Sequence, residues 1–259
     1  TALLYIAPVA ILVGIFVLYP AIKTVVLSFV EWPGYGAYKF VGFDNYIRLF
    51  TDDRNFWDTV GHTFYFAFLA SCGTVLIGFI MALLVDLKFP LWKMYRFVFF
   101  LPVTFSAVAV ALIMMRVLGP NGLINSVLDR LNLETLKVNW LGRELALTTI
   151  TLIMIWQFSG FTMIFFLAGL RNIPVELYDA ARVDGASTTR RIVSVTIPLL
   201  KNGFAVVFLV QLIFSFKAFA IFWIMTQGGP AGATEVLGTL IYRSAFSRSL
   251  MGYASSAAV

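Results

Sequence analysis

The chain alternates long apolar runs with shorter polar stretches. A helix needs about 20 mostly apolar residues to cross the roughly 30 Å of bilayer hydrocarbon, because it rises about 1.5 Å per residue. The pattern therefore predicts five complete transmembrane helices, at residues 3–28, 60–85, 97–118, 146–170 and 203–225. A sixth begins in "MGYASSAAV" (251–259), where it is truncated after too few residues to cross. The expected fold class is an all-α polytopic membrane protein with a single domain over residues 1–259.

Composition supports this class. Hydrophobic residues make up 60% of the chain and charged residues only 12%, which is about half the share found in soluble domains. Lys and Arg (19) outnumber Asp and Glu (13), but they are scattered in loops between apolar runs rather than gathered on a polar domain. We therefore expect membrane lipids, and no nucleic acid, as partners.

The distribution of Lys and Arg predicts the orientation, since cytoplasmic loops retain basic residues. The loops at 86–96 and 171–201 hold eight basic and four acidic residues, 8 − 4 = +4. Three longer loops hold eight basic and nine acidic residues, 8 − 9 = −1: 31–58, 119–145 and 226–250. The first set is expected to be cytoplasmic and the second external, which puts the N-terminus in the cytoplasm.

Two external loops show apolar residues at helical spacing. The segments "GFDNYIRLFTDDRNFWDTV" (42–60) and "NGLINSVLDRLNL" (121–133) predict short amphipathic helices on the outer surface. Packing at the membrane interface is sufficient to explain them.

The cytoplasmic segment "RNIPVELYDAARVDGASTTRRIVSVTIPLL" (171–200) is unusually polar for this chain. Pro174 suits a first helical position and Glu176 lies near the positive end of the helix dipole, so a helix is expected to begin there. It should end at about Asp184, because Gly185 can adopt the left-handed conformation that terminates helices.

A second short helix is expected to follow, with Ser187 as its cap and Pro198 as its limit. Small residues gather where the two helices meet: Ala180, Ala181, Gly185 and Ala186. Three arginines could pair with carboxylates of a partner or with lipid phosphates: Arg182, Arg190 and Arg191. The segment is therefore either a docking site for a cytoplasmic protein or a solvated amphipathic loop on the membrane face.

The segment "DAARVDGASTTRRIVSVTIPLL" (179–200) resembles the signature loop of permease subunits of ATP-binding-cassette (ABC) importers. That signature is an acidic residue, two alanines, three residues, Gly, nine residues, an aliphatic residue, one further residue and Leu-Pro. The matching positions are Asp179, Ala180, Ala181, Gly185, Val195, Ile197 and Pro198. Asp replaces Glu and Ile replaces Leu, which are mild departures.

A second resemblance narrows the group. "FKAFAIFWIMTQGGPAGATEVLGTLIYRSAF" (216–246), followed by "GYASSAAV", is similar to the last loop of carbohydrate-importer permeases of the maltose and glycerol-3-phosphate type. "LYPAIKTVVLSF" (18–29) and "FVGFDNYIRLF" (40–50) fit the same group. Ala220 is a departure, since many relatives carry an acidic residue there.

The resemblance implies a cytoplasmic coupling-helix loop that docks into a cleft of an ATPase, whose closure on nucleotide tilts the membrane helices. The expected coupling residues are Glu176, Asp179, Ala180, Ala181, Arg182, Asp184, Gly185, Ala186 and Pro198. The implied partners are a second permease subunit, usually a different chain, two cytoplasmic ATP-binding-cassette ATPases and an extracytoplasmic solute-binding protein. The implied location is the cytoplasmic (inner) membrane of a bacterium or archaeon.

The chain itself is expected to be no enzyme and to bind no cofactor, with ATP and Mg held by the partner ATPase. The sequence has no Gly-rich phosphate loop ending in Lys-Ser or Lys-Thr. Its one histidine, His62, has no catalytic or metal-binding partner nearby in the sequence and is expected at the outer end of the second span.

Transport needs a polar path through apolar helices, so polar residues at membrane depth are candidates for it. Lys217, inside the fifth predicted span, is the strongest candidate, because a charge at a helix centre costs roughly 2.5–3.5 kcal/mol unless it reaches water or a partner. It could bond a sugar hydroxyl or offset an anionic substrate. The alternatives are snorkelling to the surface or a structural hydrogen bond.

Gln211 and Ser215 are four residues apart and share a helix face, so they are further candidates. Three residues of the fourth span complete the expected sugar site: Trp156, Gln157 and Ser159. In such a site an aromatic ring stacks on a pyranose and amides bond its hydroxyls. Each of these residues could equally hold helices together. Pro102 and Gly160 are expected to weaken their helices and so let the spans tilt.

We therefore predict a permease subunit of an ATP-driven, binding-protein-dependent importer, which forms half of the path for a sugar or oligosaccharide. A permease for a polyol phosphate such as glycerol 3-phosphate is an alternative, because Lys217 could serve an anion. A membrane-embedded lipid-modifying enzyme would have to use the three acids of the loop: Glu176, Asp179 and Asp184. A channel is disfavoured because the chain lacks the charged rings of a filter.

Overall fold

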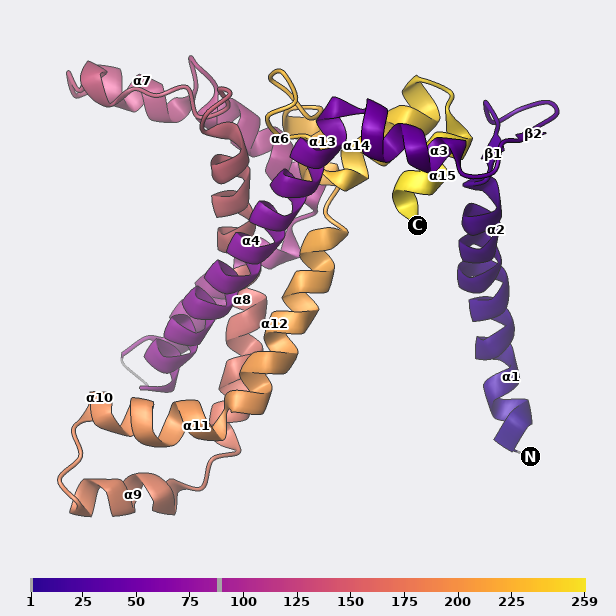
Figure 1. Cartoon of the computed structure of the whole chain (residues 1–259). Helices are drawn as coiled ribbons and strands as arrows, with labels where there is room; N and C mark the ends of the chain where they lie inside the picture. The colour runs from indigo at the N-terminus through magenta and orange to yellow at the C-terminus, as the bar shows by residue number, and fades with distance from the viewer. Residues whose placement is uncertain (1, 88–89) are drawn as a thin grey trace. The chain divides into compact units, whose positions relative to one another are not determined.

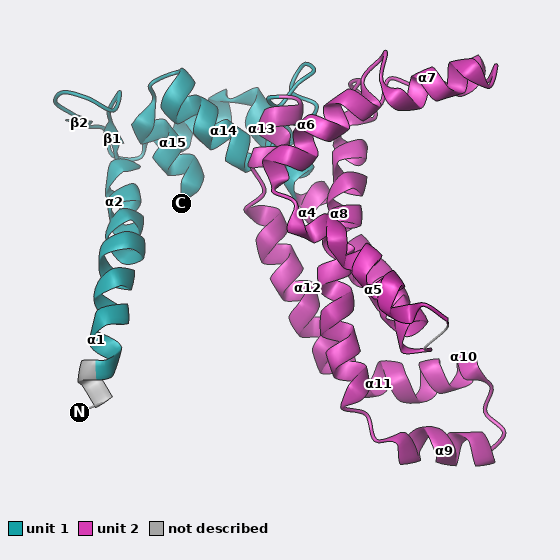
Figure 2. Cartoon of the chain, turned by 180° about the vertical axis from the view of Figure 1, so that it is seen from behind, with its two compact units in different colours: residues 1–63, 227–259 teal, residues 64–226 magenta. Residues whose placement is uncertain are grey.

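The computed structural model describes residues 2–87 and 90–259, with side chains from residue 5 onward (Figure 1). Its elements are helices apart from one two-stranded antiparallel hairpin. The described chain divides into two compact units, one of residues 1–63 and 227–259 and one of residues 64–226 (Figure 2). The all-α class is confirmed.

The first unit begins with one unbroken apolar helix, as predicted over 3–28: α1 (Ala2–Val13), a π-helical turn (Gly14–Leu18) and α2 (Tyr19–Leu27). A hairpin follows, in which β1 (Val30–Glu31) pairs with β2 (Lys39–Phe40). The rest of the unit is short helices and the start of α4: α3 (Asp44–Ile47), a π-helical turn (Arg48–Asp52), α14 (Leu237–Tyr242), a π-helical turn (Arg243–Ser247) and α15 (Met251–Ala258).

A small apolar core and one asparagine hold the first unit together. The core consists of Leu49, Phe56, Leu240 and Tyr253. Asn45, at the start of α3, donates from Nδ2 to the carbonyl oxygens of Ser28 and Val30, at 2.9 Å each. The hairpin is therefore fixed to α3 through one backbone acceptor in its first strand and one just before it.

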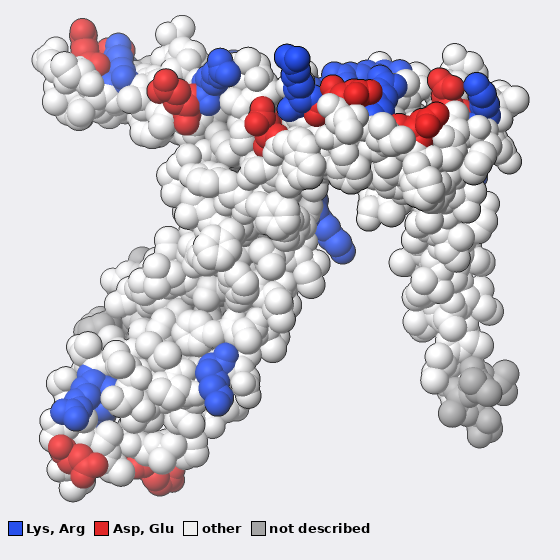
Figure 3. All heavy atoms as spheres, viewed as in Figure 1, with Lys and Arg blue, Asp and Glu red and all other residues white. Residues whose placement is uncertain are grey.

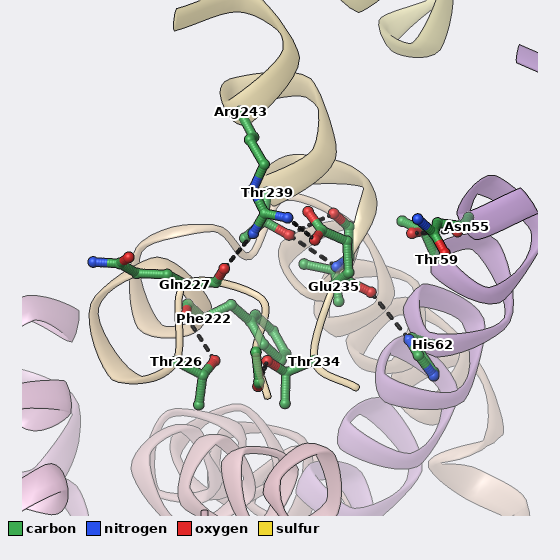
Figure 4. A network of polar contacts seen from close by, with 12 residues as sticks. Asn55, Thr59, His62, Phe222, Thr226, Gln227, Thr234, Glu235, Thr239 and Arg243 are labelled. Atoms are coloured by element: carbon green, nitrogen blue, oxygen red, sulfur yellow. Dashed lines mark hydrogen bonds and ion pairs between the residues drawn. The ribbon is translucent and has the colours of Figure 1, made fainter. Parts of the chain in front are cut away.

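An ion pair fixes the loop at 226–236 (Figure 4). Arg243 donates from Nη1 to Oε2 of the buried Glu235 and from Nη2 to the carbonyl oxygen of Gln227. Nδ1 of His62 lies 3.3 Å from the carbonyl oxygen of Glu235, so this histidine contacts the loop. No group of three or more His, Cys, Asp and Glu side chains within 2–87 and 90–259 could hold a metal ion.

The second unit is a bundle built on two long unbroken helices, α4 (Arg54–Asp86) and α8 (Ala146–Arg171). They confirm the spans predicted at 60–85 and 146–170. The other helices of this unit are α5 (Trp92–Phe100), α6 (Ala107–Leu118), α7 (Leu123–Arg130), α9 (Val175–Val183), α10 (Thr188–Arg191), α11 (Ile197–Leu199), α12 (Lys201–Phe216) and α13 (Ala220–Met225).

The prediction of one helix over 97–118 is wrong, because a break separates α5 from α6. Pro102 lacks a backbone N–H and lies in a 3-10 turn there. Ser106 then adopts an extended conformation and its Oγ accepts a hydrogen bond from the backbone N–H of Ala109 at 3.2 Å, which starts a new helix. The apolar helix long enough to cross a membrane is instead Ala107–Arg130.

The helix predicted over 203–225 is also broken, between α12 and α13. At its other end α12 meets the helix Thr188–Leu199 at 69°. Among the described residues, four helices are long and apolar enough to cross a membrane, or five if this bent pair is one span. The predicted number of five transmembrane helices is therefore reached only if the bent pair is counted as one span.

The shorter predicted helices are present. α7 lies within 121–133, and α3 with its π-helical turn lies within 42–60, although α4 already begins at Arg54. The segment predicted at 251–259 is helical over Met251–Ala258, as α15.

Aromatic rings and one glycine allow close packing in the second unit. Phe79, Phe166 and Phe204, from α4, α8 and α12, form a triangle with ring centroids 4.6 to 5.3 Å apart. At Gly160 of α8 the backbone of Phe99 approaches so closely that a Cβ would overlap its carbonyl oxygen. α8 continues through Gly160, and the glycine makes room for α5; its expected part in tilting stays a prediction.

Gly160→Ala is expected to destabilise the protein by about 1–3 kcal/mol, because a methyl group must displace the backbone of α5. The measurement is the melting temperature of the purified protein in detergent. Gly203→Ala is the matched control, since Gly203 is also helical but a Cβ added to it would meet no atom within 4 Å. A helical Gly→Ala change without a clash is stabilising by roughly 0.5–1 kcal/mol. Equal melting temperatures for the two variants would contradict the packing role.

Candidate functional site

α9 and the helix from α10 to α11 form an exposed helix–turn–helix, as the sequence predicts. Gly185 between them has φ +73°, and the Oγ of Ser187 accepts a hydrogen bond from the backbone N–H of Arg190 at 3.3 Å. Two details differ from the prediction. Pro174 precedes α9 as its cap rather than being its first residue, and the second helix runs one residue beyond Pro198.

Most of the predicted coupling residues lie on the surface of this helix–turn–helix. The exposed ones are Glu176, Asp179, Ala180, Arg182, Asp184, Gly185 and Pro198, and the half-buried ones are Ala181 and Ala186. Figure 3 shows acidic and basic side chains over α9 and α10, with a mostly uncharged surface over the helices next to them. Lys88, one of the eight basic residues counted in the loops at 86–96 and 171–201, lies outside the described residues.

The surface of the loop carries exposed charged side chains and one fully accessible apolar side chain. Arg182 Nη1 lies 3.0 Å from Asp179 Oδ1, but this exposed pair contributes only about 0–1 kcal/mol, so both groups can exchange partners. Val183 is 88% exposed at the tip of α9.

The base of the loop is fixed to the bundle. The hydroxyl groups of Tyr178 and Thr196 lie 2.9 Å apart and join α9 to the second helix. Leu200, at the 69° bend into α12, is buried in the apolar core of the unit and packs against Gly169 of α8. The loop and α12 are therefore connected through buried contacts rather than through a free linker.

A cavity of about 430 Å³ lies in the second unit, between α4, α6, α8 and the segment from α12 to α13. Three of the predicted path residues line it: Gln211, Ser215 and Lys217. The sequence analysis missed three others of interest: Thr74, Met154 and Phe158. These three lie near the middle of α4 and α8, so the cavity is about halfway along both helices.

The predicted path residues of α8 do not join this cavity. Trp156 is 44% exposed. The Oγ of Ser159 donates to the carbonyl oxygen of Ile155 at 2.5 Å, within its own helix. Gln157 is buried and donates from Nε2 to the carbonyl oxygen of Phe105 at 3.1 Å. It therefore satisfies a backbone acceptor at the break between α5 and α6.

Helical spacing would have found two of the three missed residues, Met154 and Phe158. Gln211 donates from Nε2 to the Oγ1 of Thr162 at 2.8 Å, so the polar face of α12 packs on the Thr162 face of α8. Phe158 and Met154 precede Thr162 by four and eight positions and share that face. The sequence analysis had instead predicted Trp156 from its residue type alone.

Lys217 ends α12 rather than lying inside a continuous span. Its side chain is exposed, and the ion pairs formed among the described residues do not involve it. Within the described chain it is the one charged residue that lines the cavity, where Phe158 and Phe214 supply aromatic surface.

Comparison with known proteins identifies the family. The family of binding-protein-dependent transport system inner membrane components matches residues 74–259. A probable ABC transporter permease protein of Pyrococcus horikoshii is 35% identical over 99% of this chain and 88% of its own length. The sulfoquinovosyl glycerol transport system permease protein SmoG of Agrobacterium fabrum is 35% identical over 100% of this chain and 84% of its own.

A solved structure shares the fold. In the crystal structure of a bacterial alginate ABC transporter, in complex with an alginate pentasaccharide-bound periplasmic protein, one chain is similar with a TM-score of 0.85 and 25% identity. The similarity covers 99% of this chain and 87% of that one.

The protein is thus an ABC transporter permease. It belongs to the family of binding-protein-dependent transport system inner membrane components. This membership confirms the resemblance drawn from the loop at 179–200 and makes the chain a transport subunit rather than an enzyme. The cytoplasmic position of the N-terminus stays a prediction.

Gln157→Leu is expected to lower the stability of the protein by about 0.5–1.5 kcal/mol, because it removes the hydrogen bond to the part-buried carbonyl oxygen of Phe105. Leu152→Met on the exposed face of the same helix is the control and should change stability by less than about 0.5 kcal/mol. Thermal unfolding of both purified variants in one detergent measures the difference. An unchanged melting temperature for Gln157→Leu would mean that the break is stabilised in some other way.

Proposed function

We propose that the chain is a permease subunit of an ATP-driven, binding-protein-dependent importer of a sugar or oligosaccharide, and that it forms half of the translocation path. The observation that carries the proposal is the exposed helix–turn–helix at 175–199, which has the spacing of an importer coupling loop and joins directly to a cavity-lining helix. The names of SmoG and of the alginate transporter support a carbohydrate. These two names favour a carbohydrate substrate over glycerol 3-phosphate.

The proposed partners follow from this role. Two cytoplasmic ATPases bind ATP and Mg, and one of them receives α9 and its neighbouring turn. A second permease subunit completes the path, and an extracytoplasmic solute-binding protein delivers the sugar from the other side. The complex of the alginate transporter with its loaded periplasmic protein is a solved precedent for the last contact.

The coupling is proposed to run through α12. A displacement of α9 acts on the second helix through the Tyr178–Thr196 contact and reaches α12 at the buried bend of Leu200. α12 has 16 residues, about 24 Å at 1.5 Å per residue, and Gln211 and Ser215 lie toward its other end. A tilt of this helix therefore changes the cavity without any contact between the ATPase and the sugar.

The test of the assembly is purification of the tagged full-length chain from its native membrane in mild detergent, followed by mass analysis of the intact complex. We expect a second multi-span protein and two copies of an ATPase. ATP-dependent uptake of radiolabelled oligosaccharide after reconstitution would complete the result. A chain that is purified alone, with turnover of lipid and no associated ATPase, would overturn the proposal.

Gly185→Val is expected to reduce uptake per ATP hydrolysed by roughly tenfold or more, because a β-branched residue disfavours φ +73° and adds bulk at the proposed docking turn. Uptake and ATP hydrolysis are measured together in proteoliposomes. The matched control is Gly42→Val, which has φ +59° and an equally open Cβ position outside the loop. If both variants had the same uptake per ATP hydrolysed, the loop would have no role in coupling.

A further inference from the structure

The charge of the cavity in the second unit points to a substrate class. Its described lining contains one ammonium group, that of Lys217, and no carboxylate. The remaining polar groups near it are neutral: Thr74, Gln211 and Ser215. A cavity with a single fixed sign of charge selects ligands of the opposite sign, because low-dielectric walls weaken the screening of that charge.

The neutral polar groups are already partly used. The Oγ1 of Thr74 donates to the carbonyl oxygen of Ala70 in its own helix, and the Nε2 of Gln211 donates to Thr162. The ammonium of Lys217 has three N–H donors, and the side-chain hydrogen bonds and ion pairs within the described chain use none of them. It is therefore the strongest free donor that the cavity offers.

The depth of the cavity makes this donor selective. The cavity is lined by Thr74 and Phe158, near the middle of α4 and α8. It therefore lies away from the helix ends, where lipid headgroups lie. A neutral sugar that displaces water there leaves the ammonium without a counter-charge, whereas an anionic group forms a charge-assisted hydrogen bond with it. Phe158 and Phe214 can meanwhile cover the apolar face of a sugar ring.

We propose that the transporter carries an acidic carbohydrate, one that bears a carboxylate or sulfonate group, and that Lys217 is the residue that selects for the negative charge. This proposal rests on the carbohydrate function proposed above and specifies the substrate class of the same path.

The test compares two trisaccharides of equal length and linkage, one of uronic acid units and its carboxyl-reduced neutral counterpart. Uptake of each is measured in liposomes that contain the complete transporter and its binding protein. Because the binding protein is the same throughout, the ratio of acidic to neutral uptake in each variant relative to wild type isolates the contribution of the permease. Lys217→Gln is expected to lower acidic uptake about tenfold and neutral uptake less than twofold, the effect of losing one charge-assisted hydrogen bond.

Lys217→Arg keeps the charge and should retain most of the acidic uptake, which separates charge from shape. Lys23→Gln, another lysine in an apolar helix, is the control and should leave the ratio unchanged. Neutral uptake by Lys217→Gln also establishes that this variant is assembled.

Three outcomes would overturn the proposal. A wild type that transports only the neutral trisaccharide, or a Lys217→Gln variant that reduces both sugars equally or neither, contradicts charge selection while the carbohydrate function stands. A wild type that transports neither sugar, although it hydrolyses ATP, contradicts the carbohydrate function as well.

Discussion

The constraint on which the second unit depends is that a backbone amide or carbonyl in hydrocarbon must find its partner inside the protein. A continuous helix meets this constraint by itself, as α8 does. A broken helix does not, and the break between α5 and α6 needs help from outside. Gln157 supplies a donor for the carbonyl oxygen of Phe105, and Ser106 supplies an acceptor for the free N–H of Ala109 in the first turn of α6. Two polar side chains thus make an irregular backbone tolerable in an apolar bundle.

The cavity lies next to two such breaks in the helices. α6 begins beside it at Ala107, and the residues between α12 and α13 form part of its lining. Where a helix stops, its side chains no longer fill the groove of the neighbouring helix, so space remains. The continuous helices α4 and α8 supply the rigid walls of this space, and the aromatic cluster of Phe79, Phe166 and Phe204 closes the bundle on one side of it.

The sequence was sufficient for the continuous helices and for the loop at 171–200, but not for the breaks. Hydropathy measures only the average polarity of a segment, and this average stays apolar across Pro102 and across the break at 217–219, where Lys217 is the single charge. A helix that spans the membrane and two shorter helices that meet within it therefore give the same pattern. The loop was predictable because its signals are local: Gly185 and Ser187 act through their own backbone neighbourhood. The contact between Gln157 and Phe105 joins residues 52 positions apart, so no local pattern contains it.

The same distinction decides which polar residues at membrane depth belong to a path. Serine and threonine can satisfy themselves on the carbonyl oxygen four residues earlier, as Ser159 does with Ile155, and then offer little to a substrate. Glutamine reaches beyond its own helix, and its role depends on what it contacts: a broken backbone for Gln157 and the buried Thr162 hydroxyl of α8 for Gln211. Lysine at a helix end carries a charge that a neutral carbonyl only partly offsets. A polar residue thus becomes a candidate for the path when its own fold leaves hydrogen-bonding capacity or charge unmatched. Gln157 of α8 also leaves its Oε1 unpaired, but of the two only Lys217 combines an unmatched group, here a full charge, with a place in the lining of the cavity.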